Sequence, residues 1–311
     1  MPFVLDPQIA AAFAPTGEWA PPPVGDVATR RAFLEHLFSE AAPPVPADVS
    51  VSAHHATSAD GAQIELRWYA AKDAAAGPAA IYFHGGGYIF GNAALFDGAV
   101  AAYASTTGVS VLAVDYRLAP EHPHPVPLED AYAALTWLHE RAAELSVDVD
   151  RIAVMGESAG GGLAAALAIL ARDRGGPKIV RQILIMPMLD DRTDTPDPNI
   201  APHALWSYDD NTTGWRALLG TAAGGPDVAV TAAPARLQDA VGLPPAYIEV
   251  GQLDVFRDES IAYATILSRA GVPVELHLHP GVPHIAFEFF APDADVGKRI
   301  MADRFRVLGA I

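Results

Sequence analysis

Cysteine is missing altogether from this chain of 311 residues. A chain without thiols forms no disulfide bond and holds no metal ion through thiolate ligands. Disulfides are common in oxidising compartments and rare in the cytosol, so their absence fits a reducing environment. Because 51% of the residues are hydrophobic, the chain can bury a large core in one domain. We therefore expect a cytoplasmic protein that folds without cross-links.

Basic residues are also scarce. Lys and Arg together number 20 against 37 Asp and Glu, which gives a formal net charge of −17. Nucleic-acid binding requires a clustered excess of Lys and Arg on one surface, and the sequence contains no such cluster. We therefore expect no nucleic-acid partner, and we interpret the acidic surface as an aid to solubility.

Long hydrophobic runs are absent as well. The longest apolar run, around residues 163–171, is far shorter than the roughly 20 residues that a membrane-spanning helix needs. The opening residues, MPFVLDPQIAAAFAP, lack the positively charged start and the long apolar core of a signal peptide. These features predict a soluble protein that does not bind a membrane.

What the chain does contain is an alternation of apolar strand patterns with amphipathic helix patterns. In residues 62–70, Ile64, Leu66 and Trp68 alternate with charged residues, as in a half-buried strand. Strands connected through helices pair in parallel by right-handed crossovers, so we predict an α/β fold. The other expected strands are 79–83, 109–115, one ending before Ser158, 180–186, 246–250 and 272–279, and the expected helices are 127–145, one beginning near Leu163, 258–270 and 296–308.

Two segments do not follow this alternation. Residues 190–225 are rich in Asp, Pro, Thr and Trp, and they form a longer connection than compact α/β domains usually have. Residues 1–50 are helical and punctuated by proline. We predict that 1–50 and 190–225 form two pieces of one cap over a catalytic domain of residues 51–311. The expected elements of the first segment are helices at 6–13 and 27–39 and a Pro-rich linker at 41–49.

The stretch Gly156-Glu157-Ser158-Ala159-Gly160 stands between an expected strand and an expected helix. It matches the G-x-S-x-G nucleophile elbow, in which a sharp turn holds the serine in a strained backbone conformation. Glycines two positions to either side leave room for that turn, and Gly161 and Gly162 let the helix lie close to the sheet. The pattern and its context predict that Ser158 is a nucleophile.

A serine nucleophile needs a general base, which in this elbow class follows both the serine and the acid in the chain. Four histidines come after Ser158. His203 precedes the later core strands, and His277 and His279 share one face of a strand, where no third metal ligand is evident and structural roles are favoured. His284 lies in PGVPHIAF, a loop after a strand, where open α/β sheets place their sites. We predict His284 as the base.

The acid that orients this histidine is expected just beyond another strand. Asp254 follows the strand 246–250 in the sequence AYIEVGQLD. Asp258 is a second candidate, although Asp258 and Glu259 also suit the start of a helix, where carboxylates stabilise the positive end of the dipole. We therefore predict Asp254 as the acid of a Ser-His-Asp triad.

A glycine-rich loop, YFHGGGYIFG at 82–91, follows the strand 79–83. Acyl transfer develops negative charge on a carbonyl oxygen, which preorganised N–H groups stabilise. The N–H groups of Gly85 and Gly86, together with that of Ala159, are the expected oxyanion hole. A plain glycine turn and a phosphate-binding loop are the alternatives. The phosphate loop is disfavoured because G-x-x-x-x-G-K-[ST] is not present and the glycines after Ala159 lack dinucleotide-binding spacing.

Five motifs follow one another along the chain. They are HGGGY (84–88), DYRLAPEHPHP (115–125), GESAGG (156–161), LDVFRDE (253–259) and PGVPHIAF (280–287). Together they resemble the hormone-sensitive-lipase-like carboxylesterases of the α/β-hydrolase fold, over roughly residues 80–290. The resemblance implies a mostly parallel sheet flanked by helices under a helical cap, with Ser158, Asp254 and His284 as triad and Gly85 and Gly86 in the oxyanion hole. It also implies short- to medium-chain acyl esters as substrates and a homodimer formed through the sheet edge.

The chain departs from this family's pattern at three places. Asp254 is followed by Val255, where family members often carry proline, and Glu157 stands where aspartate is commoner. Ile285 and Ala286 follow the histidine in place of a frequent Gly-Phe pair. The larger side chain of Ile285 predicts a bulkier pocket wall beside the base.

Side chains around these motifs complete the expected site. Arg117 and Glu121 of the second motif are expected to brace the oxyanion loop through ion pairs or hydrogen bonds. Aromatic residues fill cores as readily as they line pockets, so an acyl pocket and ordinary packing are equally expected for the next group. The candidates for the acyl pocket are Leu205, Trp206, Tyr208 and Phe90.

The pattern as a whole predicts a serine carboxylesterase that acts on a small-molecule ester through an acyl-enzyme intermediate, without a metal ion or an organic cofactor. An amidase or deacetylase would use the same triad, and a lipase acting at an oil–water interface is less favoured. A small-molecule receptor on a hydrolase scaffold is the alternative from another class. Loss of the base would mark such a receptor, and His284 is in place.

Overall fold

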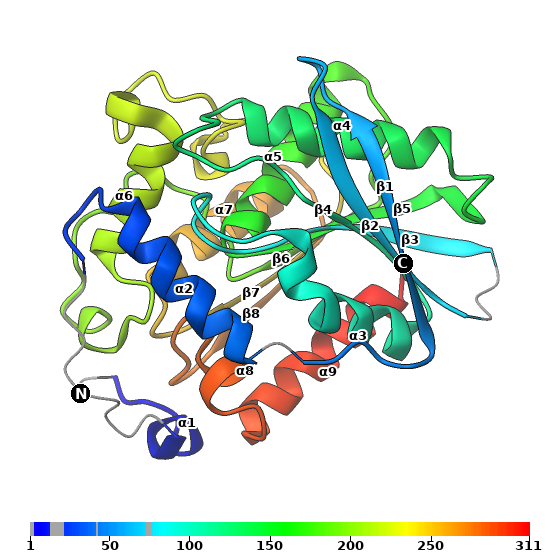
Figure 1. The fold of residues 1–311 in the computed structure, drawn as a ribbon. Helices are drawn as coiled ribbons and strands as arrows, with labels where there is room; N and C mark the ends of the chain where they lie inside the picture. Colours follow the sequence, from blue (N-terminus) through cyan, green and yellow to red (C-terminus); the bar gives the residue numbers. More distant parts are fainter. Residues whose placement is uncertain (1–2, 13–21, 42, 73–75) are drawn as a thin grey trace.

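An eight-stranded sheet forms the centre of the computed structural model, which describes residues 3–12, 22–41, 43–72 and 76–311 (Figure 1). The strands lie in the order β1-β2-β4-β3-β5-β6-β7-β8, and helices pack against the sheet, which confirms the predicted α/β class. The strands are β1 (Val49–Thr57), β2 (Gln63–Ala71), β3 (Gly77–Phe83), β4 (Ser110–Val114), β5 (Val147–Glu157), β6 (Arg181–Ile185), β7 (Ala246–Gly251) and β8 (Val274–His279).

Most neighbouring strands pair in parallel, as expected, but β2 is antiparallel to both β1 and β4. The sequence pattern does not predict β1, which begins at Val49, the last residue of the expected linker. Its strand pattern is weak because only Val49 and Ala56 of its residues are buried. A short turn at 58–62 joins β1 to β2, and so short a connection requires antiparallel pairing.

Helices cover both faces of the sheet (Figure 1). Leu135 and Leu167 belong to the core on one face, and Val100 and Val307 to the core on the other. The helix expected at 127–145 is shorter than predicted, because the chain turns after residue 140 to enter β5. The first face carries α4 (Val126–Glu140), α5 (Ala159–Arg174) and α7 (Arg257–Arg269), and the second carries α3 (Asp97–Thr107) and α9 (Asp295–Gly309).

Four further helices lie at one side of the sheet in Figure 1. Phe13, the end of the first expected helix, and Ala42, within the expected linker, lie outside the described residues. β1 and β8 form the two edges of the sheet, and β8 exposes Leu276 and Leu278. The homodimer formed through a sheet edge stays a prediction. The four helices are α1 (Pro7–Ala12), α2 (Val27–Ala41), α6 (Tyr208–Leu219) and α8 (Ala286–Phe290).

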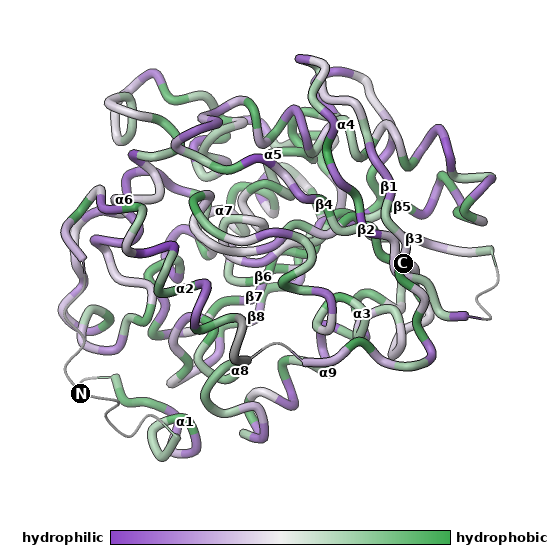
Figure 2. Tube along the Cα trace, in the orientation of Figure 1, coloured by the Kyte–Doolittle hydropathy of each residue, from purple (hydrophilic) through white to green (hydrophobic). Residues whose placement is uncertain are grey.

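The hydropathy of the chain follows this layering. Hydrophobic residues are frequent on the central strands and on α5, while the outer segments mix hydrophilic and hydrophobic residues (Figure 2). β7 is buried along its whole length, as is typical of a parallel strand covered on both faces. Within the described part of the chain, no helix is both long and apolar enough to cross a membrane.

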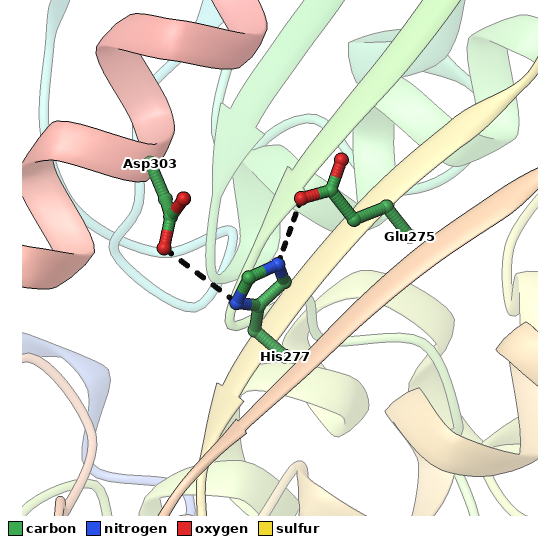
Figure 3. A group of neighbouring side chains, drawn as sticks. All are labelled: Glu275, His277 and Asp303. Atoms are coloured by element: carbon green, nitrogen blue, oxygen red, sulfur yellow. Dashed lines mark hydrogen bonds and ion pairs between the residues drawn. The ribbon is translucent and has the colours of Figure 1, made fainter.

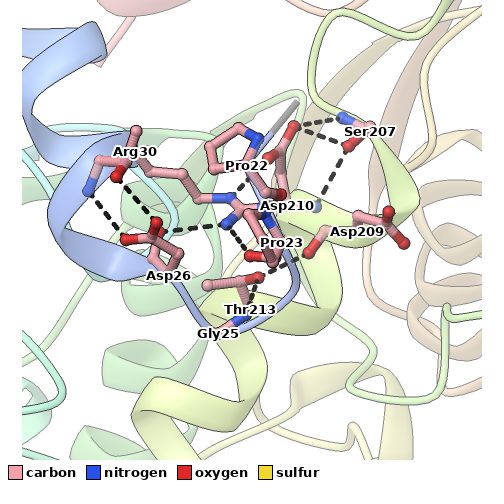
Figure 4. A network of polar contacts seen from close by, with 10 residues as sticks. Pro22, Pro23, Gly25, Asp26, Arg30, Ser207, Asp209, Asp210 and Thr213 are labelled. Carbon is pink, nitrogen blue, oxygen red and sulfur yellow. Dashed lines mark hydrogen bonds and ion pairs between the residues drawn. The ribbon is translucent and has the colours of Figure 1, made fainter. Parts of the chain in front are cut away.

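A buried arginine joins the two segments that are predicted to form the cap. Arg30 of α2 is 3% exposed, and its Nε donates to Asp210 Oδ1 of α6 at 2.7 Å. Its Nη1 donates to the carbonyl oxygen of Pro23 at 2.7 Å, and its Nη2 to that of Pro22 at 2.9 Å (Figure 4). The guanidinium thus connects α2, the turn before it and α6. That these elements act as a cap for a binding site stays a prediction.

Replacing Arg30 with methionine is expected to lower the free energy of unfolding by about 3–5 kcal/mol, because the change leaves the Asp210 carboxylate and three carbonyl groups without their buried donor. Urea denaturation followed by circular dichroism measures the loss. Arg141→Met is the matched control, since Arg141 is exposed and lies 3.5 Å from Glu144 in a surface ion pair. Equal stability of the two variants would contradict this role of Arg30.

Candidate active site

Ser158 lies at the sharp turn between β5 and α5. Its backbone has a φ of 56° and a ψ of −119°, a conformation that non-glycine residues rarely adopt. Hydrogen bonds hold the turn on both sides: the Ser158 N–H donates to the Ile185 carbonyl oxygen at 2.8 Å, and the Met188 N–H donates to the Ser158 carbonyl oxygen at 2.9 Å. The strained turn is therefore fixed by the end of β6 and by the segment that follows it.

The glycines on either side of Ser158 are required by space. A Cβ at Gly156 would lie 2.2 Å from the carbonyl oxygen of Gly160, and a Cβ at Gly160 would lie 2.0 Å from the carbonyl oxygen of Phe83. The next two glycines, at 161–162, lie close to the segment after β6, since a Cβ at Gly162 would lie 2.1 Å from the carbonyl oxygen of residue 188. The elbow therefore depends on close backbone contacts that a side chain would break.

Gly160→Ala is expected to lower the free energy of unfolding by about 3 kcal/mol, because its Cβ would force apart backbone atoms of the elbow and of β3. Chemical denaturation gives the size of the loss. Gly309→Ala is the matched control: Gly309 also lies in a helix, and its Cβ would come no closer than 3.8 Å to Thr107. A Gly160→Ala protein as stable as the control would show that the elbow tolerates a side chain there.

His284 contacts both of its expected partners. Its Nε2 lies 3.0 Å from Ser158 Oγ, and its Nδ1 lies 2.7 Å from Asp254 Oδ2. All three residues are buried, with exposed fractions of 6% for Ser158, 3% for His284 and 0% for Asp254. An ionised carboxylate only accepts hydrogen bonds, so Nδ1 carries the proton and Nε2 accepts from the serine hydroxyl. These contacts match the expected triad, and the catalytic roles stay a prediction.

The three side chains converge because they follow parallel strands of one sheet. Ser158 follows β5, Asp254 follows β7 and His284 follows β8, and the carboxyl ends of parallel strands share one edge. Asp258, the second candidate for the acid, is exposed and pairs with Arg257 at 2.7 Å. His203 lies in a short 3₁₀ turn within the segment 190–225. Neither is among the partners of His284.

The glycine loop after β3 lies against the serine turn. A Cβ at Gly85 would come within 3.4 Å of Ser158 Cβ, and Gly86 has a φ of 119° that favours glycine. Among the described residues, no hydrogen bond links the N–H of Gly85, Gly86 or Ala159 to a protein acceptor. Ala159 is the first residue of α5, whose opening N–H groups have no partner within the helix. These three donors are available to an oxyanion, and that role stays a prediction.

The buried side chain of His84, which is 1% exposed, anchors the glycine loop. Its ring stacks on Tyr116 at a centroid distance of 4.3 Å, and the Tyr116 hydroxyl donates to the His84 carbonyl oxygen at 2.8 Å. Burial lowers the pKa of His84 to about 4, so the ring is neutral at physiological pH. The stacking and the hydrogen bond make His84 a structural support of the glycine loop.

The ion pairs around the glycine loop differ in part from the prediction that Arg117 and Glu121 support it. Glu121 does form an ion pair, but its partner is Arg31 of α2 at 2.6 Å. Arg31 also donates to the carbonyl oxygens of Ile89 and Ala119, at 2.5 and 2.8 Å. Arg117 instead binds Asp60 and Asp130, both at 2.7 Å, beside the first hairpin. The sequence analysis did not identify Arg31 as a partner of this loop, because Arg31 lies 58 residues before Ile89 and a local sequence pattern does not connect the two.

The four candidates for the acyl pocket lie in different surroundings. The six-membered ring of Trp206 covers Gly87 of the glycine loop, where a Cβ would lie 2.4 Å from the indole. Leu205 packs against the apolar cluster that contains Phe287, and Phe90 packs on Phe38 at 5.3 Å. Tyr208 is buried, and its hydroxyl accepts from the N–H of residue 197 at 3.2 Å. Trp206 is thus adjacent to the expected oxyanion hole, and contact of all four with substrate stays a prediction.

The acidic residue before Ser158 is buried next to an arginine, which the sequence pattern does not reveal. Glu157 is 8% exposed, and its carboxylate lies 3.8 Å from the guanidinium of Arg304 in α9. Burial, together with repulsion from Glu288, raises the pKa of Glu157 to about 8. The carboxyl group preceding the expected nucleophile is therefore mostly neutral at pH 7, although it is an acidic residue.

Glu157→Gln is expected to change how stability depends on pH. In the unfolded chain Glu157 has the ordinary glutamate pKa of 4.5, against about 8 in the folded protein. Between these values the folded state holds a proton that the unfolded state releases, so the wild type loses stability as pH rises from 5 to 8. Glutamine stays neutral, so the variant gains stability relative to wild type across this window.

Melting temperatures at pH 5, 6, 7 and 8 test this expectation. Glu259 also has a pKa raised by burial to about 8, and its contribution cancels because it is the same in both proteins. The groups that surround Glu157 are Tyr82, Tyr103, Glu249, Glu288 and Arg304. A difference in melting temperature that stays constant with pH would show that Glu157 is ionised in the folded protein throughout.

The sequence shows no third metal ligand near His277, but the structure places two carboxylates beside its ring. Its ring lies between Glu275 of β8 and Asp303 of α9, at 2.8 and 3.6 Å (Figure 3). These three groups have the separation of metal ligands. However, Arg306 forms ion pairs with both Glu275 and Asp303, so a guanidinium already supplies positive charge to these carboxylates. The group is best described as a surface ion-pair network, in keeping with a structural role for His277.

Comparison with known protein families matches residues 80–288 to a family described as having the alpha/beta hydrolase fold. Esterase LipI of Mycobacterium tuberculosis is 41% identical over 214 residues, which are 66% of this chain and 64% of that protein. Carboxylesterase NlhH of the same species is 40% identical over 225 residues, 70% of this chain and 69% of that protein. The match to LipI thus covers slightly less than two thirds of its length.

The fold is also similar to that of solved structures over nearly the whole chain. The structure entitled Bacterial Heroin Esterase superposes with a TM-score of 0.91 at 37% identity, and the match covers 99% of this chain and 98% of that one. The matched family segment contains Ser158, Asp254, His284 and the glycine loop.

Proposed function

The chain belongs to the hormone-sensitive-lipase-like family of α/β hydrolases, and from this premise we propose that it is a serine carboxylesterase acting on short- to medium-chain acyl esters. One observation supports the proposal most directly. His284 lies within hydrogen-bond distance of both Ser158 Oγ and the buried Asp254 carboxylate. A serine hydroxyl is a weak nucleophile near neutral pH, and this arrangement supplies the base that activates it.

In the acylation step, Ser158 Oγ attacks the carbonyl carbon of the ester while His284 Nε2 takes the hydroxyl proton. The carbonyl oxygen becomes an oxyanion, which accepts hydrogen bonds from the N–H groups of Gly85, Gly86 and Ala159. Asp254 stabilises the imidazolium that forms. The bond to the leaving oxygen then breaks, His284 gives its proton to that oxygen, and an alcohol departs from the acyl-enzyme.

In the deacylation step, water takes the place of the alcohol. His284 removes a proton from the water as its oxygen attacks the acyl carbon, and the same N–H groups stabilise the second oxyanion. Collapse of this intermediate breaks the bond to Ser158 Oγ, which recovers its proton from His284. The carboxylic acid leaves, and the enzyme returns to its starting state.

The substrate class is tested with a series of p-nitrophenyl esters from acetate to dodecanoate, together with p-nitroacetanilide as an amide of the same chromophore. We expect the highest kcat/KM for acyl chains of two to about eight carbons and slower cleavage of the amide. Faster cleavage of the amide than of the acetate would assign an amidase instead. Failure to cleave any of these compounds, even at stoichiometric enzyme concentrations, would favour a receptor on a hydrolase scaffold.

A further inference from the structure

A buried arginine, Arg304, lies next to the residue that precedes Ser158. Arg304 of α9 is 1% exposed, and its guanidinium faces three acidic side chains. Its Nε donates to Glu249 Oε1 at 2.7 Å, while its Nη1 lies 2.8 Å from Glu288 Oε1 and 3.8 Å from Glu157 Oε1. A guanidinium presents its donors in a rigid plane, so these contacts set the positions of the three acids relative to one another.

Each of these acids belongs to an element that lies next to a residue of the expected triad in the chain. Glu157 immediately precedes Ser158, Glu249 lies on β7, which leads to Asp254, and Glu288 lies on α8, which begins two residues after His284. Arg304 itself comes from a fourth element, α9. The arginine thus connects, through one group, the three chain segments that must stay in register for Ser158 and His284 to meet.

The segment after His284 needs such a support. Ile285 has a φ of 49°, and this left-handed conformation is unfavourable for a β-branched residue. The helix that follows, α8, has only five residues and is too short to be stable by itself. Arg304 holds α8 by two contacts, the ion pair with Glu288 and the approach of its guanidinium carbon to the Phe287 ring at 5.4 Å.

Electrostatic attraction also holds Arg304 and its acidic partners in place. An isolated buried ion is costly, so Arg304 requires carboxylate partners in its buried position. Glu249 is 1% exposed and is held in turn by the Tyr247 hydroxyl, which donates to its Oε2 at 2.6 Å. Glu249 therefore fixes the guanidinium against the sheet. The remaining face of the guanidinium is directed to Glu288 and Glu157, next to the site.

We propose that Arg304 is a positioning residue that keeps His284 at hydrogen-bond distance from Ser158 by anchoring α8 to the sheet through Glu288 and Phe287. The inference rests on the proposed function for its kinetic consequences. Loss of the anchor displaces the imidazole relative to the serine hydroxyl while it leaves the substrate-contacting surface in place. Displacement of a catalytic group by about 1 Å costs on the order of a hundredfold in rate. The effect therefore falls on kcat rather than on KM.

Three variants test the proposal. Arg304→Met is expected to lower kcat for p-nitrophenyl butyrate by about a hundredfold, and Glu288→Gln by about tenfold, each with a KM within about twofold of wild type. Arg304→Lys keeps the charge and is expected to recover part of the loss. Glu288 is partly exposed, so its variant preserves folding even if a change at the fully buried arginine does not. Arg306→Met, an exposed arginine of the same helix, is the control and retains wild-type kcat.

A second measurement is independent of turnover. The Nδ1–H proton of His284, which is hydrogen-bonded to Asp254, gives a downfield proton resonance that His284→Asn identifies by its loss. This resonance is expected to shift or broaden in Glu288→Gln and Arg304→Met and to stay unchanged in Arg306→Met. Wild-type kcat and an unchanged resonance in folded Glu288→Gln would overturn the proposal. If the wild type cleaves no ester, the proposed function fails, and the resonance alone decides whether Arg304 positions His284.

Discussion

Replacing Ser158 with alanine is expected to lower kcat for p-nitrophenyl butyrate by about a millionfold, because the variant has no atom to form the acyl-enzyme. The oxyanion donors and the binding surface remain, so a residual rate above the uncatalysed reaction persists. Substrate affinity changes little, since the hydroxyl contributes to the transition state rather than to binding of the ester. Initial rates measured at saturating substrate with wild type and variant at equal concentration give the ratio.

Ser260→Ala is a matched control for this change. Ser260 is fully buried in α7, and among the described residues its hydroxyl has no hydrogen-bond partner. Removing that hydroxyl is therefore expected to leave kcat within about twofold of wild type, because the loss of a buried hydroxyl without a partner removes no interaction. If Ser158→Ala retained a tenth or more of the wild-type rate, another residue would be the nucleophile.

The fold could be predicted where one local pattern dominates the environment of an element. β7 is buried along its length and appears in the sequence as a short apolar run that is interrupted only by Glu249, and α9 shows one apolar face. β1 could not be found in this way, because it is an edge strand whose alternating small and polar side chains face solvent. α6 lies in the segment 190–225, where the capping serine, Ser207, was the available signal of a helix start.

In the candidate site, too, residues of a local motif could be predicted, and residues that act through distant partners could not. Ser158 and the glycines around it form one short motif whose geometry depends on adjacent residues. Asp254 and His284 could be placed because strand ends share one edge of the sheet, a rule of topology rather than of sequence. Arg304 could not be recognised, because it lies between the surface residues Asp303 and Arg306 of α9 and its partners come from three other elements.

Asp254→Asn is expected to lower kcat by about ten thousandfold while the protein stays folded. The amide is nearly identical in shape to the carboxylate, and its oxygen can still accept from the Phe256 N–H, which donates to Asp254 Oδ1 at 2.9 Å. Its nitrogen, however, would face His284 Nδ1 as a donor. Nδ1 would then have to accept, and the ring proton would move to Nε2, where it blocks acceptance of the Ser158 proton.

The size of the decrease in kcat distinguishes a carboxylate that orients the base from one that only lies in the same region. Asp258→Asn removes the same charge from the second candidate, which is exposed and paired with Arg257, and is expected to leave kcat within about twofold of wild type. Measuring kcat and KM for both variants on p-nitrophenyl butyrate, with circular dichroism to verify folding, distinguishes the two. A ten thousandfold loss at Asp258 with none at Asp254 would exchange their roles. Comparable activity in both variants would mean that His284 takes its proton from Ser158 without a carboxylate partner.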